Sequence, residues 1–186
     1  MANNHVCPWW FGCLLARPLR RLFEDPARVL APFLQPGFTV LEPGPGMGFF
    51  TLELARLTGP AGRVVAVDIQ PKRIEALKRR AARAGLPERI DARLAGAASM
   101  GIGGLAGGVG FALAFAVVHE VPGAPRFFEE VAAALSSGGR LPLAEPSGHV
   151  SAREFEAELA AAAGAGLRQL NPLSIRRSRA ALLEKA

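Results

Sequence analysis

TVLEPGPGMGFF, residues 39–50, is the stretch that decides the fold. It begins with a short apolar run, which predicts a buried strand. The acid Glu42 follows, and glycine then stands at three alternate positions, Gly44, Gly46 and Gly48. Glycine at such positions lets the backbone turn tightly and come close to a ligand. We therefore expect a strand that ends in a ligand-binding turn.

Two common glycine loops do not fit this stretch. The dinucleotide fingerprint requires glycine three residues after its second glycine, and here that residue is Phe49. The Walker loop requires Lys followed by Ser or Thr, and residues 39–50 contain no Lys. An acid in front of the turn would also repel a phosphate. The turn therefore suits a cationic or hydroxyl-bearing ligand.

Strand-like and helix-like segments alternate along most of the chain. The predicted strands are 38–41, 63–67, 90–94, 111–118, 140–144, 167–170 and 180–184, and the last two could form a hairpin. The predicted helices are 49–57, 71–84, 125–135 and one that Ser151 caps, with Glu154 completing a capping box. This alternation predicts an α/β, Rossmann-like, doubly wound fold with a mostly parallel seven-stranded sheet and helices on both faces. Pro142 is unfavourable inside its strand because it removes a ladder donor.

Length and composition are those of an ordinary globular chain. The 186 residues suit one domain with a short appendage, and 50% are hydrophobic, enough for a core without a disulfide or metal staple. Cys7 and Cys13 cannot build a disulfide framework. We divide the chain into an N-terminal helical and aromatic lid segment, residues 1–36, and a core domain, residues 37–186.

The basic charge is weak evidence of function. The net charge is +6, but nineteen Arg stand against three Lys beside an excess of Ala, which indicates a compositional bias. The basic residues fall in short clusters, which we interpret as solvated surface. These clusters are Arg17, Arg20 and Arg21; Lys72, Arg73, Lys78, Arg79, Arg80 and Arg83; and Arg176, Arg177 and Arg179.

One uncharged stretch requires a membrane test. Residues 94–118 carry no charge but hold seven Gly between Gly96 and Gly110, and glycine disfavours a helix by about 1 kcal/mol per residue. The N-terminus lacks the basic region of a secretory signal. We therefore expect no membrane association and a cytoplasmic location.

The acid followed by x-Gly-x-Gly-x-Gly resembles motif I of the class I S-adenosylmethionine-dependent methyltransferases. Residues 64–68 resemble the family's second strand, and Asp68 lies twenty residues after Gly48. Residues 111–120 resemble the fourth strand with its following His-Glu, and LSSGGR, 135–140, resembles the glycine loop before the fifth strand. Within the family, the chain is most similar to the group that includes the ubiquinone/menaquinone biosynthesis methyltransferases.

The resemblance implies S-adenosylmethionine as cofactor and S-adenosylhomocysteine as product. Glu42 would meet the amino group of the cofactor, Asp68 both ribose hydroxyls, and Ile69 the adenine. The glycine turn would pack beside the amino-acid end, and the end of the fourth strand would lie under the sulfonium. The cofactor-binding residues implied are Glu42, Gly44, Pro45, Gly46, Gly48, Asp68, Ile69, Ala97, Ala98 and Phe115.

The chain departs from the family pattern in two cofactor positions. Family members often carry an acid at or beside the position of Ala97 to accept from the adenine amino group, and residues 95–110 contain none. They often begin the fourth strand with Asp, where this chain has Gly110. Losing one acceptor costs about 1 kcal/mol. These departures, together with Pro142 in the predicted fifth strand, keep open a catalytically degenerate cofactor-binding protein.

Methyl transfer from a sulfonium needs mainly positioning of donor and acceptor. A general base is required only when the acceptor arrives protonated. His119 is the catalytic candidate for that role; the alternative is that it caps the strand end or anchors the next loop. Glu120 is a second candidate, and His149 either lines the acceptor region or lies in a surface loop.

The N-terminal segment admits two uses. His5, Cys7 and Cys13 match no zinc spacing, so we expect no metal. Trp9, Trp10 and Phe11 either cover the cofactor as a lid or pack on a sheet edge.

We see no room for a separate substrate domain. The sequence therefore predicts a small-molecule methyl acceptor rather than nucleic acid. The enzyme alternative is an RNA methyltransferase, which the Arg clusters motivate.

Overall fold

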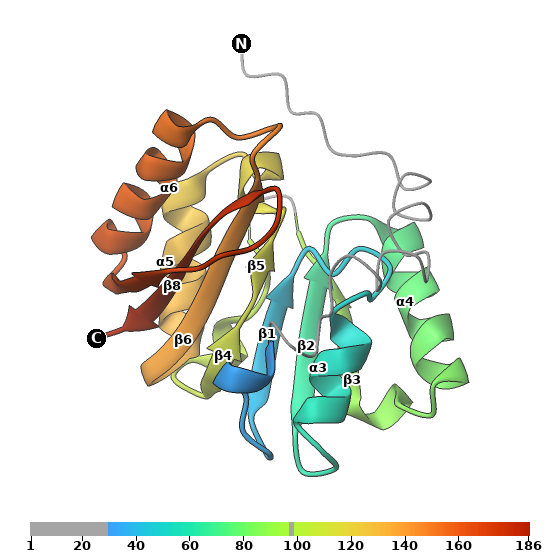
Figure 1. The fold of residues 1–186 in the computed structure, drawn as a ribbon. Helices are drawn as coiled ribbons and strands as arrows, with labels where there is room; N and C mark the ends of the chain where they lie inside the picture. Colours follow the sequence, from blue (N-terminus) through green and yellow to red (C-terminus); the bar gives the residue numbers. More distant parts are fainter. Residues whose placement is uncertain (1–29, 97–98) are drawn as a thin grey trace. The chain divides into compact units, whose positions relative to one another are not determined.

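The computed structural model describes residues 30–96 and 99–186 (Figure 1). The first 29 residues of the expected lid segment, with the metal and lid candidates in them, lie outside the described residues, and so does the first Arg cluster. The described chain divides between Gly101 and Ile102 into two compact units. We call residues 30–101 the glycine-loop unit and residues 102–186 the histidine unit.

The glycine-loop unit is built on three parallel strands. They are β1 (Thr39–Pro43), β2 (Arg63–Asp68) and β3 (Ile90–Leu94). The strands pair in register, so that Leu41 lies opposite Val65 and Val65 opposite Asp91. Continuous apolar runs such as Val64–Val67 are typical of parallel strands buried on both faces.

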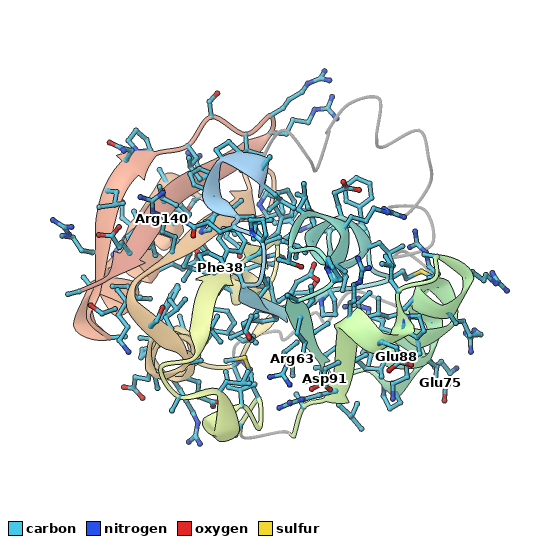
Figure 2. The ribbon with its side chains drawn as sticks, turned by 90° about the horizontal axis from the view of Figure 1, so that it is seen from below. Phe38, Arg63, Glu75, Glu88, Asp91 and Arg140 are labelled. Carbon is cyan, nitrogen blue, oxygen red and sulfur yellow. The ribbon has the colours of Figure 1, made fainter. Side chains whose placement is uncertain are left out.

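Two helices connect these strands (Figure 1). Helix α3 (Thr51–Leu57) contacts β2, and α4 (Pro71–Arg83) contacts β2 and β3. Pro71 suits the first turn of α4, where its missing N–H costs nothing. Gly85, with φ of 69°, ends that helix as the sequence predicted. Figure 2 looks onto the unit from below and shows Arg63 beside Asp91, where β2 begins.

The histidine unit contains a mixed sheet. Strands β4 (Val109–Ala112) and β5 (Ala114–Phe115) pair in parallel with β6 (Leu135–Pro146). Antiparallel to β6 runs β8 (Ser178–Lys185), which pairs in turn with β7 (Leu167–Pro172) as the expected hairpin. Helices α5 (Ala124–Ala134) and α6 (Ala152–Gly164) lie side by side (Figure 1).

The predicted start of α6 is confirmed. Ser151 Oγ accepts from the Glu154 N–H at 3.3 Å, and Glu154 Oε2 accepts from the Ser151 N–H at 2.7 Å. These reciprocal bonds form the capping box expected from the spacing.

The predicted strand 111–118 is wrong in its continuity and its end. Its register pairs Phe111 with Arg140 and Ala114 with Leu143, which places Leu113 opposite Pro142. Proline has no N–H to donate, and the strand divides into β4 and β5 at that level. Ala116 then adopts φ of 53°, which ends β5 and puts His119 in a short 3-10 turn, Val118–Glu120.

The predicted loop at 135–140 is also wrong, because these residues begin β6. Val109 pairs with Leu135, whereas Phe111 pairs with Arg140, so the intervening residues form an irregularity within the strand. Gly138 has φ of 72°, and a Cβ on Gly139 would lie 2.8 Å from the Ser136 carbonyl oxygen. The two glycines therefore permit a bulge rather than a loop.

The expected fold class is confirmed as α/β, with mostly parallel strand pairing and flanking helices. The described residues hold eight strands instead of seven, since the expected fourth strand is split. No helix among the described residues is long and apolar enough to cross a membrane.

Candidate functional site

The glycine turn joins the carboxyl end of β1 to the segment before α3. Gly44, Gly46 and Gly48 all have positive φ, 66°, 56° and 80°. The Gly44 N–H donates to the Val67 carbonyl at 2.8 Å, which ties the turn to the end of β2. A Cβ on Gly48 would stand 2.5 Å from Leu77 Cδ1 on α4, so a side chain there would have to displace the buried Leu77. The sequence requirement for glycine thus has a steric cause at Gly48.

Glu42 lies near the carboxyl end of β1 and is only 3% exposed. Burial raises the pKa of Glu42 to about 7, and the nearby Thr51 hydroxyl opposes that rise. Its Oε2 atom is buried and accepts no hydrogen bond from any residue that the structure describes. A buried acceptor without a donor is costly, so Glu42 suits a donor supplied by a ligand.

Asp68 ends the neighbouring strand β2 and is 4% exposed. Its Oδ1 accepts from the Gln70 N–H at 2.8 Å, whereas its Oδ2 lies 3.6 Å from Arg73 Nη1 and accepts no hydrogen bond within the described chain. Burial raises the pKa of Asp68, and the Gln70 N–H and Arg73 oppose that rise. Glu42 and Asp68 are thus two buried acids near the ends of paired strands, each with an acceptor atom to spare.

One face of α4 braces this arrangement. Arg73, Leu77 and Arg80 recur at helical spacing, and Arg80 Nη1 donates to the Met47 carbonyl oxygen within the glycine turn. The Arg73 side chain is only 11% exposed. Our interpretation of this basic cluster as solvated surface is therefore wrong for Arg73, because the helix turns it toward Asp68. The i, i+4, i+7 spacing was the available signal.

The other expected cofactor contacts fall into three groups. Ile69 follows Asp68 and is 53% exposed, an unusual exposure for so large an apolar side chain. Pro45 is part of the glycine turn, and Ala97 and Ala98 lie outside the described residues. Phe115 ends β5 in the histidine unit.

The histidine unit also holds a buried acid near a strand end. Glu145 lies near the carboxyl end of β6 and is fully buried. Its Oε1 accepts from the N–H groups of Val117 and Val118, at 3.1 and 2.8 Å, and its Oε2 is hydrogen bonded to His119 Nδ1. Sequence reasoning missed Glu145, although LAEP at 143–146 repeats the pattern of an acid ending an apolar run seen in VLEP at 40–43.

Two more titratable side chains surround His119. The hydrogen bond with Glu145 is the main cause that raises the pKa of His119, against the effect of burial. Glu158 of α6 is buried, and burial followed by the charge of Glu145 raises its pKa to about 8. The ring of His149 meets that of His119 edge to face, with centroids 5.8 Å apart. His149 is thus a neighbour of His119 within the unit.

The sequence family described as a methyltransferase domain matches residues 34–174. The chain therefore belongs to the methyltransferase domain family. The narrower ubiquinone/menaquinone-like group stays a prediction.

One curated relative and two solved structures illustrate the similarity. A catechol O-methyltransferase of Mycobacterium tuberculosis is 46% identical over 52 residues, which cover 28% of this chain and 24% of that enzyme. A SAM-dependent methyltransferase from Aquifex aeolicus has a TM-score of 0.86 at 21% identity, covering 97% of this chain and 100% of the other. A geranyl diphosphate methyltransferase in complex with SAM has a TM-score of 0.70 at 17% identity, covering 95% and 90%. At these identities the solved structures support the fold.

Proposed function

We propose that this protein transfers a methyl group from S-adenosylmethionine to a small-molecule acceptor. The observation that carries the proposal is the pair Glu42 and Asp68. Both are buried near the ends of adjacent parallel strands, and each keeps an acceptor atom that no described residue satisfies. Family membership and the solved neighbours support the same cofactor.

The donor groups of the cofactor match these acceptors chemically. Glu42 receives the cationic amino group, which favours the ionised carboxylate despite its burial. Asp68 receives the ribose hydroxyls, since a carboxylate can accept several hydrogen bonds. Gly44, Gly46 and Gly48 let the backbone approach the amino-acid end without side-chain interference. The exposed Ile69 offers an apolar surface to adenine.

S-adenosylmethionine supplies an electrophilic methyl group on a sulfonium. The protein's part is to orient the cofactor and the acceptor and to support the change of charge. Three further roles rest on the family resemblance. Phe115 would lie beside the sulfonium, and Ala97 and Ala98 would lie along adenine. His119 would act as base for a protonated acceptor.

The acceptor is a small molecule in this proposal. The names of two similar proteins specify catechol and geranyl diphosphate as their acceptors, both small molecules. An RNA acceptor is the alternative, and it predicts binding that weakens steeply with salt.

Titration calorimetry with S-adenosylmethionine and S-adenosylhomocysteine tests the cofactor. We expect both compounds to bind the full chain. The variant Glu75→Ala should bind them with wild-type affinity, because Glu75 lies on the outer side of α4 (Figure 2). Undetectable binding of both would defeat the proposal.

Transfer of a labelled methyl group to a panel of small hydroxyl, amine and thiol compounds and to total RNA then tests the acceptor. A labelled small molecule supports the proposal, and labelled RNA replaces it with the alternative. Cofactor binding without any transfer would favour a degenerate cofactor-binding protein.

A further inference from the structure

The side chains around Glu145 form a polar cluster within the histidine unit, in which Glu145 and Glu158 are buried, His119 is partly buried and His149 is exposed. It consists of Glu145 on β6, His119 in the 3-10 turn after β5, Glu158 on α6 and His149 after β6. Glu154, also on α6, and Glu120, beside His119, act on the cluster through their charges. Because these titratable groups lie close together, the charge of each one affects where the protons of the others lie.

The hydrogen bonds of Glu145 determine where the proton of His119 lies. Oε1 already accepts from the two backbone N–H groups of Val117 and Val118. An ionised carboxylate can only accept, so His119 Nδ1 must donate to Oε2. Any proton that His119 exchanges is then the one on its other nitrogen, Nε2.

Glu158 carries a proton of its own in this cluster. Its Oε2 is buried and receives no hydrogen bond from the part of the chain that the structure describes. Both burial and the charge of Glu145 disfavour ionisation of Glu158. Near neutral pH Glu158 is therefore mostly protonated, and its neutral carboxyl adds no second negative charge beside Glu145.

We propose that Glu145 is a positioning residue that keeps a proton on Nδ1 of His119, so that Nε2 is the atom at which His119 releases and accepts protons. The use of this arrangement rests on the proposed function. An acceptor hydroxyl that gains the methyl group loses its proton, and Nε2 of neutral His119 takes it. His119 then carries the positive charge that the sulfonium gives up. The acceptor class implied is a group that must lose a proton on methylation.

Glu145→Gln is the sharpest variant because it preserves the shape of the side chain. The amide oxygen of Gln can still accept from Val117 and Val118. Its NH₂ group must then face His119, and Nδ1 has to become the acceptor. The variant therefore reverses the tautomer of neutral His119 from Nδ1–H to Nε2–H without removing the backbone contacts.

Two-bond ¹H–¹⁵N spectra of the full chain labelled at histidine, recorded from pH 6 to 10, read the tautomer directly. The chain has three His, so His5→Asn and His149→Asn identify the His119 signals. In wild type we expect neutral His119 to carry its proton on Nδ1. Glu145→Gln should move it to Nε2 and lower the pKa of His119 by about one unit or more, whereas Glu158→Gln should lower the pKa less and leave the tautomer unchanged.

The proposal is overturned if neutral His119 in the wild-type protein carries its proton on Nε2. This result can be observed without any Glu145 variant. It is also overturned if Glu145→Gln folds and retains the Nδ1–H form. Calorimetry with S-adenosylhomocysteine separates this result from the proposed function. The expected tautomer without cofactor binding would leave the proton arrangement standing and remove its use in methyl transfer.

Discussion

Both units bury acids near the carboxyl ends of parallel strands, but these acids differ in the hydrogen bonds that they accept. Glu145 in the histidine unit receives two backbone N–H groups and His119. Glu42 and Asp68 in the glycine-loop unit each keep a buried oxygen that accepts no hydrogen bond from the described residues, although Arg73 forms an ion pair with Asp68. A satisfied acid holds its own loop, whereas an unsatisfied one is suited to a ligand's donors. Burial alone therefore does not distinguish a structural acid from a binding acid.

Glu145→Ala should give the largest effect on stability. It leaves two buried N–H groups and His119 without their acceptor, which costs about 4 kcal/mol. The raised pKa of His119 means that its part of this stabilisation is fully present below the pKa of the unfolded chain and is lost as the pH rises through the folded value. Urea unfolding at pH 6 and pH 9 should show the larger deficit at pH 6.

Glu129 is exposed, so Glu129→Ala is the matched control for Glu145→Ala and should change the stability little. An equal, small loss for both variants would show that Glu145 does not hold the turn. The contrast between a satisfied and an unsatisfied acid would then break down in the histidine unit.

Asp68→Ala should give the largest effect on cofactor binding. Two hydrogen bonds from hydroxyls to a carboxylate contribute about 3 kcal/mol together, so the affinity for S-adenosylhomocysteine should fall roughly 100-fold. Asp68→Asn keeps one acceptor and should fall about 10-fold, while Glu75→Ala should retain wild-type affinity. Calorimetry measures all three, and unchanged affinity in Asp68→Ala would remove the ribose contact from the proposal.

Glu42→Gln should weaken binding in a pH-dependent way. With a pKa of about 7, Glu42 is mostly ionised at pH 8 and mostly neutral at pH 6. The loss of affinity for S-adenosylhomocysteine should therefore be about 10-fold at pH 8 and smaller at pH 6. Calorimetry at both values checks this, and an equal loss at both would contradict a titrating Glu42.

The stability of the cofactor-free protein gives an independent check on Glu42. The unfolded chain releases this proton near pH 4.5, while the folded chain keeps it up to about pH 7. Stability should therefore fall as the pH rises through that window, and Glu42→Gln should remove the fall. A wild-type pH profile identical to that of the variant would show that Glu42 ionises normally.

The sequence predicted the glycine-loop unit more accurately than the histidine unit, and the reason is physical. β2 and the start of α4 follow directly from local signals, an apolar run and a proline at the first turn. The split between β4 and β5 depends on Pro142 in a strand 29 residues further on, through the pairing register. A long-range register cannot be obtained from local pattern.

The candidate site shows the same division. Glu42, Asp68 and the three glycines stand in one local motif and the strand that follows it, so the sequence could nominate them. Arg73 and Glu145 could not be placed, because their roles depend on which face of α4 meets the turn and on contacts 26 to 28 residues distant. What a buried acid contacts is a tertiary property, even where its position at a strand end is visible in the sequence.

Gly46→Ala should give the smallest effect, and it has a matched partner in Gly59→Ala. Both glycines have positive φ, 56° and 70°, and a Cβ at either would meet no atom of the described residues within 4 Å. Both variants should therefore lose about 1 kcal/mol of stability from backbone strain alone. Only Gly46 lies in the glycine turn that follows β1. Only Gly46→Ala should therefore also lose affinity for S-adenosylhomocysteine, by roughly five-fold. Equal affinity in the two variants would mean that the ligand does not approach the backbone of the turn, and that the glycines serve only its conformation.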